Sequence, residues 1–346
     1  MANGNLLDTY VIGFDRSIRE MVEVKGGKLR PYVQLATGDL FRKEGVYQLT
    51  KGGGLPEKVT NRFGDSPVSM LDYERRRTTR TSFQDAQFMD WVDLSKMGTD
   101  PRSQKMNAMK NKFLRQEDII LDQALLGSAQ GGDNGVTPTT LPNSAFVSPI
   151  AGAVDSGSPT DAEKGFTYTK FLAALETFGN NNVDIEQYTP VFKISWTEWN
   201  NIMRDDKFID FDYTEARPID KGMGQIYSYM GTHFCVSNIL PFMDEDKTTA
   251  YTQADLQIAD ADINTTTGTW KDTGGASNTK AVYAFVQDAA LLEINPDLTT
   301  KVSERADKSF NFYAYMKMEL GAVRMEEEKV VVIPCTNPYL EGENNC

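Results

Sequence analysis

The sequence has little of the side-chain chemistry that most enzymes and metal proteins use. Its 346 residues include one histidine, His233, and three cysteines. A metal site built from several histidines of one chain is therefore excluded. His233 lies in a strand-like run, where a structural role is the default, so we also exclude a histidine-based catalytic triad. The cysteines, Cys235, Cys335 and Cys346, are odd in number and irregularly spaced, which predicts free thiols in a reducing compartment.

Long hydrophobic runs and targeting segments are also missing. No apolar run approaches 18 residues, so we expect no membrane span. Residues 1–10 lack a basic region followed by an apolar core, so we expect no signal peptide and a product that is soluble and cytoplasmic when made. Neither a Walker loop nor a dinucleotide-binding glycine pattern is present. The pair Gly222 and Gly224 lacks the third glycine and the preceding strand of that pattern.

Acidic clusters are the remaining candidates for a metal or catalytic site. Residues 244–246 and 260–262 could hold a cation through carboxylate oxygens. Neither cluster has EF-hand spacing, and solvated acidic loops are the better interpretation. We therefore predict no catalytic residues, no cofactor and no metal.

The charge is acidic and unevenly distributed. The formal net charge is −13. Residues 1–130 hold 20 Lys and Arg against 17 Asp and Glu, whereas the rest of the chain holds 16 against 32. This distribution argues against a protein that reads nucleic-acid sequence, because neutralising phosphates needs a basic surface.

The stretch that organises the chain is a predicted helix from Pro101 to about Ala129. Asp100 suits the N-cap, and proline suits the first helical position. Apolar residues recur three or four apart, and no Gly or Pro interrupts the run before Gly127. At 1.5 Å per residue, such a helix spans roughly 40 Å.

The charges of this helix run against its dipole, which prefers acidic residues near the N-terminus. Its first half is basic instead. Two interpretations stay open: the cations are simply solvated, or a partner segment, from another copy of the chain, neutralises them. The candidate contact residues here are Arg102, Lys105, Lys112 and Arg115.

Residues 1–36 read as an arm, and residues 37–98 as a long two-stranded excursion with glycine-rich turns. A two-stranded hairpin is only marginally stable alone, so this one needs another surface to lie on. The returning strand carries an arginine cluster, which could bind phosphate, face solvent, or pair with carboxylates of a neighbouring subunit. The cluster consists of Arg75, Arg76, Arg77 and Arg80.

The remainder predicts an α+β fold. Residues 131–165 are rich in Gly, Ser, Thr and Pro, which favours extended or loop structure. Residues 166–295 mix short helices with strands, and Ser195 with Glu198 forms a capping box that opens one helix. Residues 310–320 alternate with period two, which predicts a long strand beside the helix. Gly321 is expected to interrupt it, and residues 329–334 give a last buried strand.

This order of elements resembles the major capsid protein of tailed bacteriophages, with the Hong Kong 97-like fold. The stretches that carry the resemblance are 73–93 with the helix that follows, 281–292, and 307–334. The resemblance implies an α+β protein divided into an N-terminal arm (1–36), an extended loop (37–98), a spine helix with part of a peripheral domain (99–165), an axial domain (166–295), long peripheral strands (296–326), and a final axial strand with the C-terminal tail (327–346).

The same resemblance implies a structural role. Copies would assemble as hexamers and pentamers into an icosahedral shell around double-stranded DNA, in the cytoplasm of a bacterial host and then in the virion. A separate scaffolding protein, a portal and decoration proteins are the expected partners, with no membrane and no sequence-specific contact to the DNA. The alternatives are a non-viral, encapsulin-like shell protein of the same fold, and a soluble α+β binding protein or enzyme.

Overall fold

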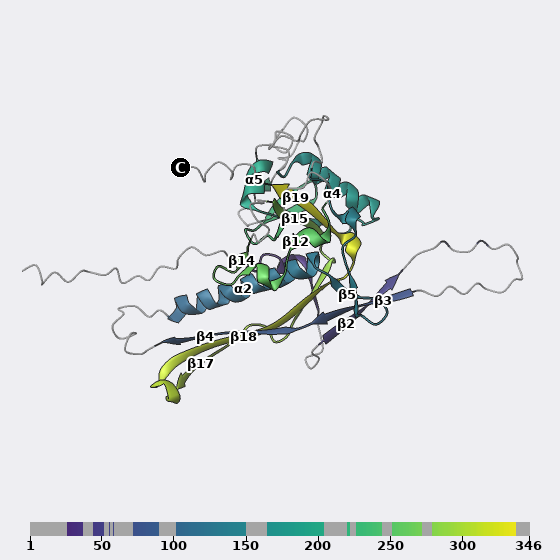
Figure 1. Cartoon of the computed structure of the whole chain (residues 1–346). Coiled ribbons are helices and arrows are strands. Elements are labelled where there is room, and N and C mark those ends of the chain that lie inside the picture. Colours follow the sequence, from purple (N-terminus) through teal and green to yellow (C-terminus); the bar gives the residue numbers. More distant parts are fainter. Residues whose placement is uncertain are drawn as a thin grey trace, which may run out of the picture.

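A computed structural model describes residues 26–36, 44–51, 55, 58, 72–89, 102–149, 165–203, 220–221, 226–243, 251–271 and 279–336. The fold is mixed α and β, as predicted, and it is elongated (Figure 1). Within the described ranges, no helix is both long and apolar enough to cross a membrane.

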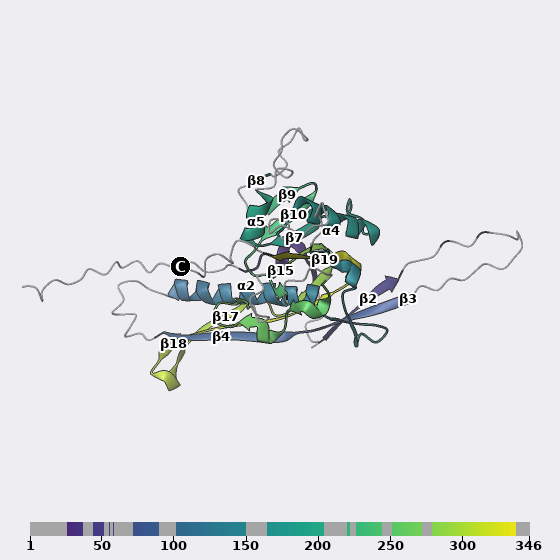
Figure 2. The ribbon, with the colours of Figure 1, turned by 45° about the horizontal axis from the view of Figure 1, so that its top comes forward.

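The predicted long helix is confirmed as α2, Arg102–Leu126. It ends three residues before the predicted Ala129, because the chain turns at Gly127 and continues directly into a short strand. The backbone N–H of Gly127 still donates to the Gln123 carbonyl, at 2.8 Å. The helix lies along the longest strand of the molecule, and both run in nearly the same direction in two views (Figures 1 and 2).

That long strand is β18, Asn311–Arg324, and it confirms the predicted period-two strand. Its even-numbered side chains face α2 and form an apolar layer with the helix. The buried members of this layer are Met109, Phe113, Ala314, Met316, Met318 and Leu320. Because one face of β18 packs on one stripe of α2, helix and strand stiffen each other over most of their length.

The expectation that Gly321 interrupts this strand is wrong, because β18 continues to Arg324. Gly321 is needed for a close approach between chain segments. A Cβ at this position would lie 2.7 Å from the carbonyl oxygen of Thr79, in the returning strand of the hairpin. The glycine therefore lets the extended hairpin cross over the long strand.

Five strands make up the sheet around β18. Its order is β1, β16, β18, β17, and β4 pairs with the other edge of β18. The additional strands are β1 (Gln34–Ala36), β4 (Thr81–Met89), β16 (Ala290–Ile294) and β17 (Thr299–Arg305). The hairpin chain thus does not end at its arginine cluster: after Arg80 it continues as β4 and joins this sheet.

The predicted α+β unit in the middle of the chain is built on an eight-stranded sheet. Its order is β12, β11, β15, β7, β10, β9, β8, and β19 also pairs with β15. The strands are β7 (Pro190–Ile194), β8 (Asp220–Lys221), β9 (Ile226–Tyr229), β10 (Thr232–Val236), β11 (Phe242–Met243), β12 (Leu256–Gln257), β15 (Thr279–Val286) and β19 (Val330–Thr336). The last predicted strand, 329–334, is confirmed as β19.

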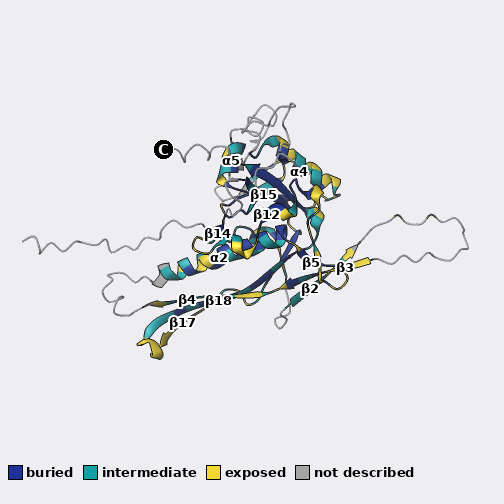
Figure 3. Ribbon diagram, in the orientation of Figure 1, coloured by how far each residue is buried: buried dark blue, intermediate teal, exposed yellow. Residues whose placement is uncertain are grey.

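Two helices pack with this sheet: α4, Tyr168–Asn180, and α5, Trp196–Ile202. One half of the predicted capping box of α5 is confirmed, because the Ser195 hydroxyl accepts the backbone N–H of Glu198 at 3.3 Å. The Glu198 carboxylate accepts the N–H of Phe166 at 3.0 Å. The largest apolar core of the molecule lies here, where the sheet strands are buried (Figure 3).

The predicted hairpin is confirmed as β2 (Glu44–Lys51) and β3 (Asp72–Thr79), which pair antiparallel. They project to one side of the body, away from the tip of β17 (Figure 1). Two short strands, β5 (Ala129–Gly131) and β6 (Thr137–Thr139), extend this small sheet at its base. They agree with the extended structure predicted after α2.

Two further segments lie against α2. The predicted N-terminal arm is described from residue 26, where it crosses the helix and then pairs as β1 in parallel with β16. The chain between β12 and β15 contributes a short hairpin, β13 (Ile263–Asn264) with β14 (Thr269–Trp270). Residues 1–25 of the arm lie outside the described residues.

Candidate functional site

The arginine cluster divides into two faces, as the strand alternation predicts. Arg75 is exposed and Arg77 is half-buried, where it pairs with Glu44 across the hairpin. Arg76 and Arg80 point the other way, and their side chains are 2% and 6% exposed. Arg80 lies 3.4 Å from Glu293 of β16. Arg75 is therefore the member whose side chain is most available to another molecule.

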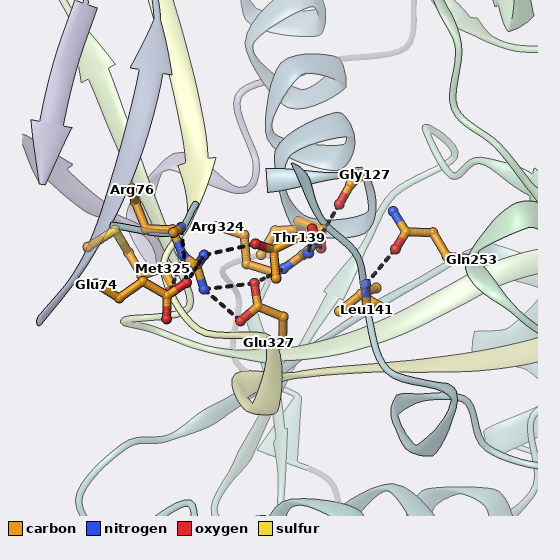
Figure 4. Close-up of polar contacts among 11 residues, drawn as sticks. Glu74, Arg76, Gly127, Thr139, Leu141, Gln253, Arg324, Met325 and Glu327 are labelled. Atoms are coloured by element: carbon orange, nitrogen blue, oxygen red, sulfur yellow. Dashed lines mark hydrogen bonds and ion pairs between the residues drawn. The ribbon is translucent and has the colours of Figure 1, made fainter. Parts of the chain in front are cut away.

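Arg76 is the centre of a buried polar network at the base of the hairpin (Figure 4). Its guanidinium donates to both carboxylate oxygens of Glu327, at 2.9 and 2.7 Å, and to Glu74 at 2.7 Å. Its Nε donates to the backbone carbonyl of Met325 at 2.8 Å. The three nitrogens of this planar guanidinium thus reach three different partners, Nη2 to Glu327, Nη1 to Glu74 and Nε to Met325, which fixes its direction as well as its position. Arg76 therefore joins the hairpin to the loop between β18 and β19.

Arg324, the last residue of β18, extends this network to the helix (Figure 4). Its guanidinium donates to the backbone carbonyls of Leu125 and Gly127 at 2.8 and 2.5 Å, and to that of Thr139 at 3.1 Å. The carbonyls at a helix C-terminus lack partners within the helix and attract cations. Burial lowers the pKa of Arg324 to about 10, while the nearby Glu327 acts in the opposite direction.

The hairpin, α2, β18 and the loop that follows β18 thus meet at two neighbouring arginines, Arg76 and Arg324. Burial raises the pKa of Glu327 above its ordinary value, and the charge of Arg76 opposes that rise. The orientation of the projecting hairpin is consequently set by ionic contacts within its own chain. Sequence reasoning read Arg76 as a candidate contact between subunits and did not identify this role, because its partner Glu327 is 251 residues away.

The basic half of α2 is only partly available. Lys112 is exposed and pairs with Asp85 of β4 at 2.8 Å, and Lys105 is half-buried. Arg115 is buried beside Gly268 of the β13–β14 turn. The side chain of Arg102 lies outside the described residues. Lys112 and Arg115 also line a cavity of about 310 Å³ between α2, β4 and this turn.

The acidic half of α2 is buried, which the sequence did not indicate. Asp122 accepts hydrogen bonds from Lys193 at 2.6 Å, Tyr283 at 2.5 Å and Trp270 at 3.0 Å. Lys193 and Asp122 side chains are 0% exposed. This network ties the spine helix to β7 and β15 of the eight-stranded sheet and to β14. Burial first, and then the charge of Asp122, raise the pKa of Tyr283.

The other candidates from the sequence do not form a reactive centre in the described part of the chain. His233 lies in β10, as predicted, with its ring 6.2 Å from that of Tyr32. Residues 260–262 form a short turn in which Asp262 caps the Ala259 N–H at 2.9 Å. Residues 222–224 and 244–246 lie outside the described residues. Among those described, no three His, Cys, Asp or Glu side chains are grouped as metal ligands.

Two of the cysteines are free and buried, as predicted for a chain without a disulfide framework. Burial raises the pKa of the Cys235 thiol to about 11 and that of Cys335 further. Such thiols stay protonated at neutral pH and are poor nucleophiles. Cys346 lies outside the described residues.

Comparison with known proteins gives the same fold over almost the whole chain. The capsid of cyanophage P-SCSP1u superposes with a TM-score of 0.67 at 14% identity, over 97% of this chain and 96% of that one. The capsid of cyanophage Pam1 gives 0.63 at 13% identity, over 97% and 99%. The mature capsid of bacteriophage PhiM1 gives 0.62 at 10% identity, over 95% and 92%.

At these identities the structural likeness establishes the fold alone, which is the Hong Kong 97-like fold. No curated protein matches the sequence significantly. The phage capsid protein family, however, matches residues 6–337. The long spine helix, the projecting hairpin and the eight-stranded sheet are therefore those of a capsid subunit, and this chain belongs to the phage capsid protein family.

Proposed function

We propose that this capsid protein assembles as hexamers and pentamers into a closed icosahedral head shell that encloses the double-stranded DNA of a tailed phage. The observation that carries the proposal is the β2–β3 hairpin. It projects beyond the body, and the contacts that the described residues make with it lie at its base, through β5, β6 and the Arg76 network. Val46 and Tyr73 on this hairpin are 57% and 52% exposed. A ribbon of this kind gains stability when it lies on another subunit.

The remaining parts of the proposal follow from the family and the charge. The division of the chain into regions describes how each region would meet its neighbours. The regions are the arm (1–36), the extended loop (37–98), the spine (99–165), the axial domain (166–295), the peripheral strands (296–326) and the final strand with the tail (327–346). In that scheme β4 is the part of the extended loop that pairs with the peripheral strand β18. The acidic charge of residues 131–346 fits DNA that is enclosed and not tightly bound.

A separate scaffolding protein, a portal and decoration proteins remain proposed partners, and the host cytoplasm remains the proposed place of assembly. The protein acts through its contacts and not by catalysis in this proposal. No cofactor is required.

Expression of the full-length chain tests the proposal directly. We expect closed shells of uniform diameter by negative-stain microscopy and a fast-sedimenting species, with the chain alone or with a co-expressed scaffolding protein from the same phage. A product that stays monomeric under both conditions contradicts shell formation.

The exposed side of the arginine cluster provides a sharper test. Replacing Arg75 and Arg77 by glutamate places negative charge where we propose that a neighbouring subunit presents carboxylates. Exposed ion pairs contribute about 0–1 kcal/mol each, so losing two of them lowers the association constant of neighbouring subunits up to about 30-fold. We expect a normal circular dichroism spectrum and a greatly reduced yield of shells in sedimentation.

The matched control replaces the same two residues by glutamine, which removes the positive charge without reversing it. We expect this variant to give an intermediate yield of shells. Normal shells from the glutamate variant would show that neither residue makes a contact between subunits that assembly needs.

A further inference from the structure

The N-terminal segment 26–36 crosses the middle of α2 in direct backbone contact. The N–H of Gly27 donates to the carbonyl of Leu114 at 3.0 Å. The N–H groups of Lys28 and Leu29 donate to the carboxylate of Asp118 at 3.3 and 3.2 Å. Only glycine fits at the crossing point, because a Cβ on Gly26 would lie 2.3 Å from the backbone nitrogen of Arg115. The segment therefore covers the helix from about residue 114 to residue 118.

A carboxylate without hydrogen bonds is buried under this cover. The side chain of Glu117 is 0% exposed, and within the described structure neither of its oxygens has a hydrogen-bond partner. Buried carboxylates normally receive two or more hydrogen bonds, because an ionised one without them loses its hydration and gains little in return. The position thus suits a protonated side chain better than an ionised one.

Three charged groups act on Glu117. The nearest cation is Arg30 of the covering segment, with its Nε 3.8 Å from Glu117 Oε1. Arg30 is shared, since its Nη2 lies 3.1 Å from Asp297, which follows β16. Asp118 is adjacent on the helix itself. Two carboxylates and one half-exposed guanidinium leave Glu117 in surroundings that favour its neutral form.

We propose that Glu117 makes the 26–36 segment a pH-sensitive latch on the spine helix. In the closed latch Glu117 is protonated and covered. When the carboxyl group ionises, it requires water, and the segment that excludes water from it loosens. The geometry makes the covering segment the element that responds, because it supplies both the cover and the nearest cation.

The direction of the effect follows from linkage between protonation and opening. Burial raises the pKa of Glu117 to about 7 in the closed state, and Arg30 limits that rise. When the latch opens, the pKa returns to its ordinary value near 4.5. The closed state therefore binds the extra proton. Its stabilisation by that proton is fully present below about pH 4.5, declines as the pH rises, and is lost once the pH has passed about 7. These two values imply that opening becomes about 30-fold more favourable between pH 5.5 and 8.0.

Hydrogen exchange of the full-length protein measures this opening. The reporters are the amides of Gly27, Lys28 and Leu29, after correction for the intrinsic effect of pH on exchange. We expect their protection to fall about 30-fold from pH 5.5 to 8.0, while amides of β7 in the core change little. In Glu117→Gln, which is neutral at every pH, we expect protection at pH 8.0 to stay near its value at pH 5.5.

Two further variants bracket the result. Gly26→Ala forces the segment off the helix at any pH and gives the exchange expected of an open latch. Glu304→Gln removes an exposed carboxylate on β17 and should keep the wild-type pH dependence. The proposal is overturned if the wild-type reporters show no pH dependence, or if Glu117→Gln retains the wild-type pH profile. Hydrogen exchange of the reporter amides can be measured, and either outcome observed, whether or not the protein forms shells.

Discussion

Replacing Asp122 by alanine is expected to lower the free energy of unfolding by about 3–5 kcal/mol. Asp122 accepts three hydrogen bonds in a site without solvent. Its removal leaves the ammonium group of Lys193, which is 0% exposed within β7, without its hydrogen-bonded carboxylate. It also leaves the Tyr283 hydroxyl and the Trp270 N–H without this acceptor. Urea unfolding of the unassembled full-length chain, followed by circular dichroism, measures the loss.

The control for this substitution removes the ion pair as a whole. A double variant with Asp122→Leu and Lys193→Met has no buried charge to leave unpaired, so we expect a smaller loss than for Asp122→Ala alone. Lys193→Met alone should be costly as well, because it leaves the carboxylate as the unpaired group. If the single alanine variant unfolds at the wild-type urea concentration, the network does not hold the helix to the sheets.

The elements of this fold were predictable wherever one residue pattern decided the structure locally. The length of α2 followed from the absence of breakers between Pro101 and Gly127. The alternation of residues 310–320 gave β18, because one face of that strand packs on the helix and the other does not. Ser195 and Glu198 marked the start of α5 through hydrogen bonds within a single turn.

The polar interior was not predictable, because its partners are far apart in the sequence. Asp122 and Lys193 are separated by 71 residues, and in a sequence each reads as a solvated charge. The same holds for Glu117, whose burial depends on a segment near the N-terminus. The sequence showed that charges along α2 oppose the helix dipole. It could not show that the acidic half is buried against other elements and that the basic half remains partly exposed.

Gly321 illustrates the opposite kind of error. A glycine inside a strand pattern usually weakens the strand, so an interruption was the reasonable expectation. In the structure the strand continues, since the absence of a side chain lets Thr79 approach. The low strand propensity of glycine is therefore outweighed by the close crossing of two segments that lie more than two hundred residues apart in the sequence.

The second large effect is expected for Arg76→Met, which should prevent shell assembly by releasing the base of the hairpin. The substitution keeps much of the side-chain volume and removes the guanidinium. The carboxylates of Glu74 and Glu327, 16% and 12% exposed, then lose their main cation, and the carbonyl of Met325 loses a donor. Leaving such a partly buried network unpaired costs about 3–5 kcal/mol. Sedimentation of the expressed protein measures shells, and exchange of the β2 and β3 amides measures the local loss.

The effect should be confined to the hairpin and its base. Asp122 and its partners lie in a separate network, so urea unfolding of the eight-stranded sheet should change less in Arg76→Met than in Asp122→Ala. Arg76→Lys keeps the charge, but its single nitrogen cannot replace the three guanidinium nitrogens that reach Glu327, Glu74 and Met325, and it should give fewer shells than wild type but more than the methionine variant. Adding Glu327→Gln to Arg76→Met removes one of the two carboxylates that lost Arg76, leaving less negative charge at the site, and should partly restore the protection of β3. This partial recovery distinguishes an electrostatic clamp within the subunit from a direct contact of Arg76 with a neighbour, because a lost contact with a neighbour would not be restored by neutralising Glu327.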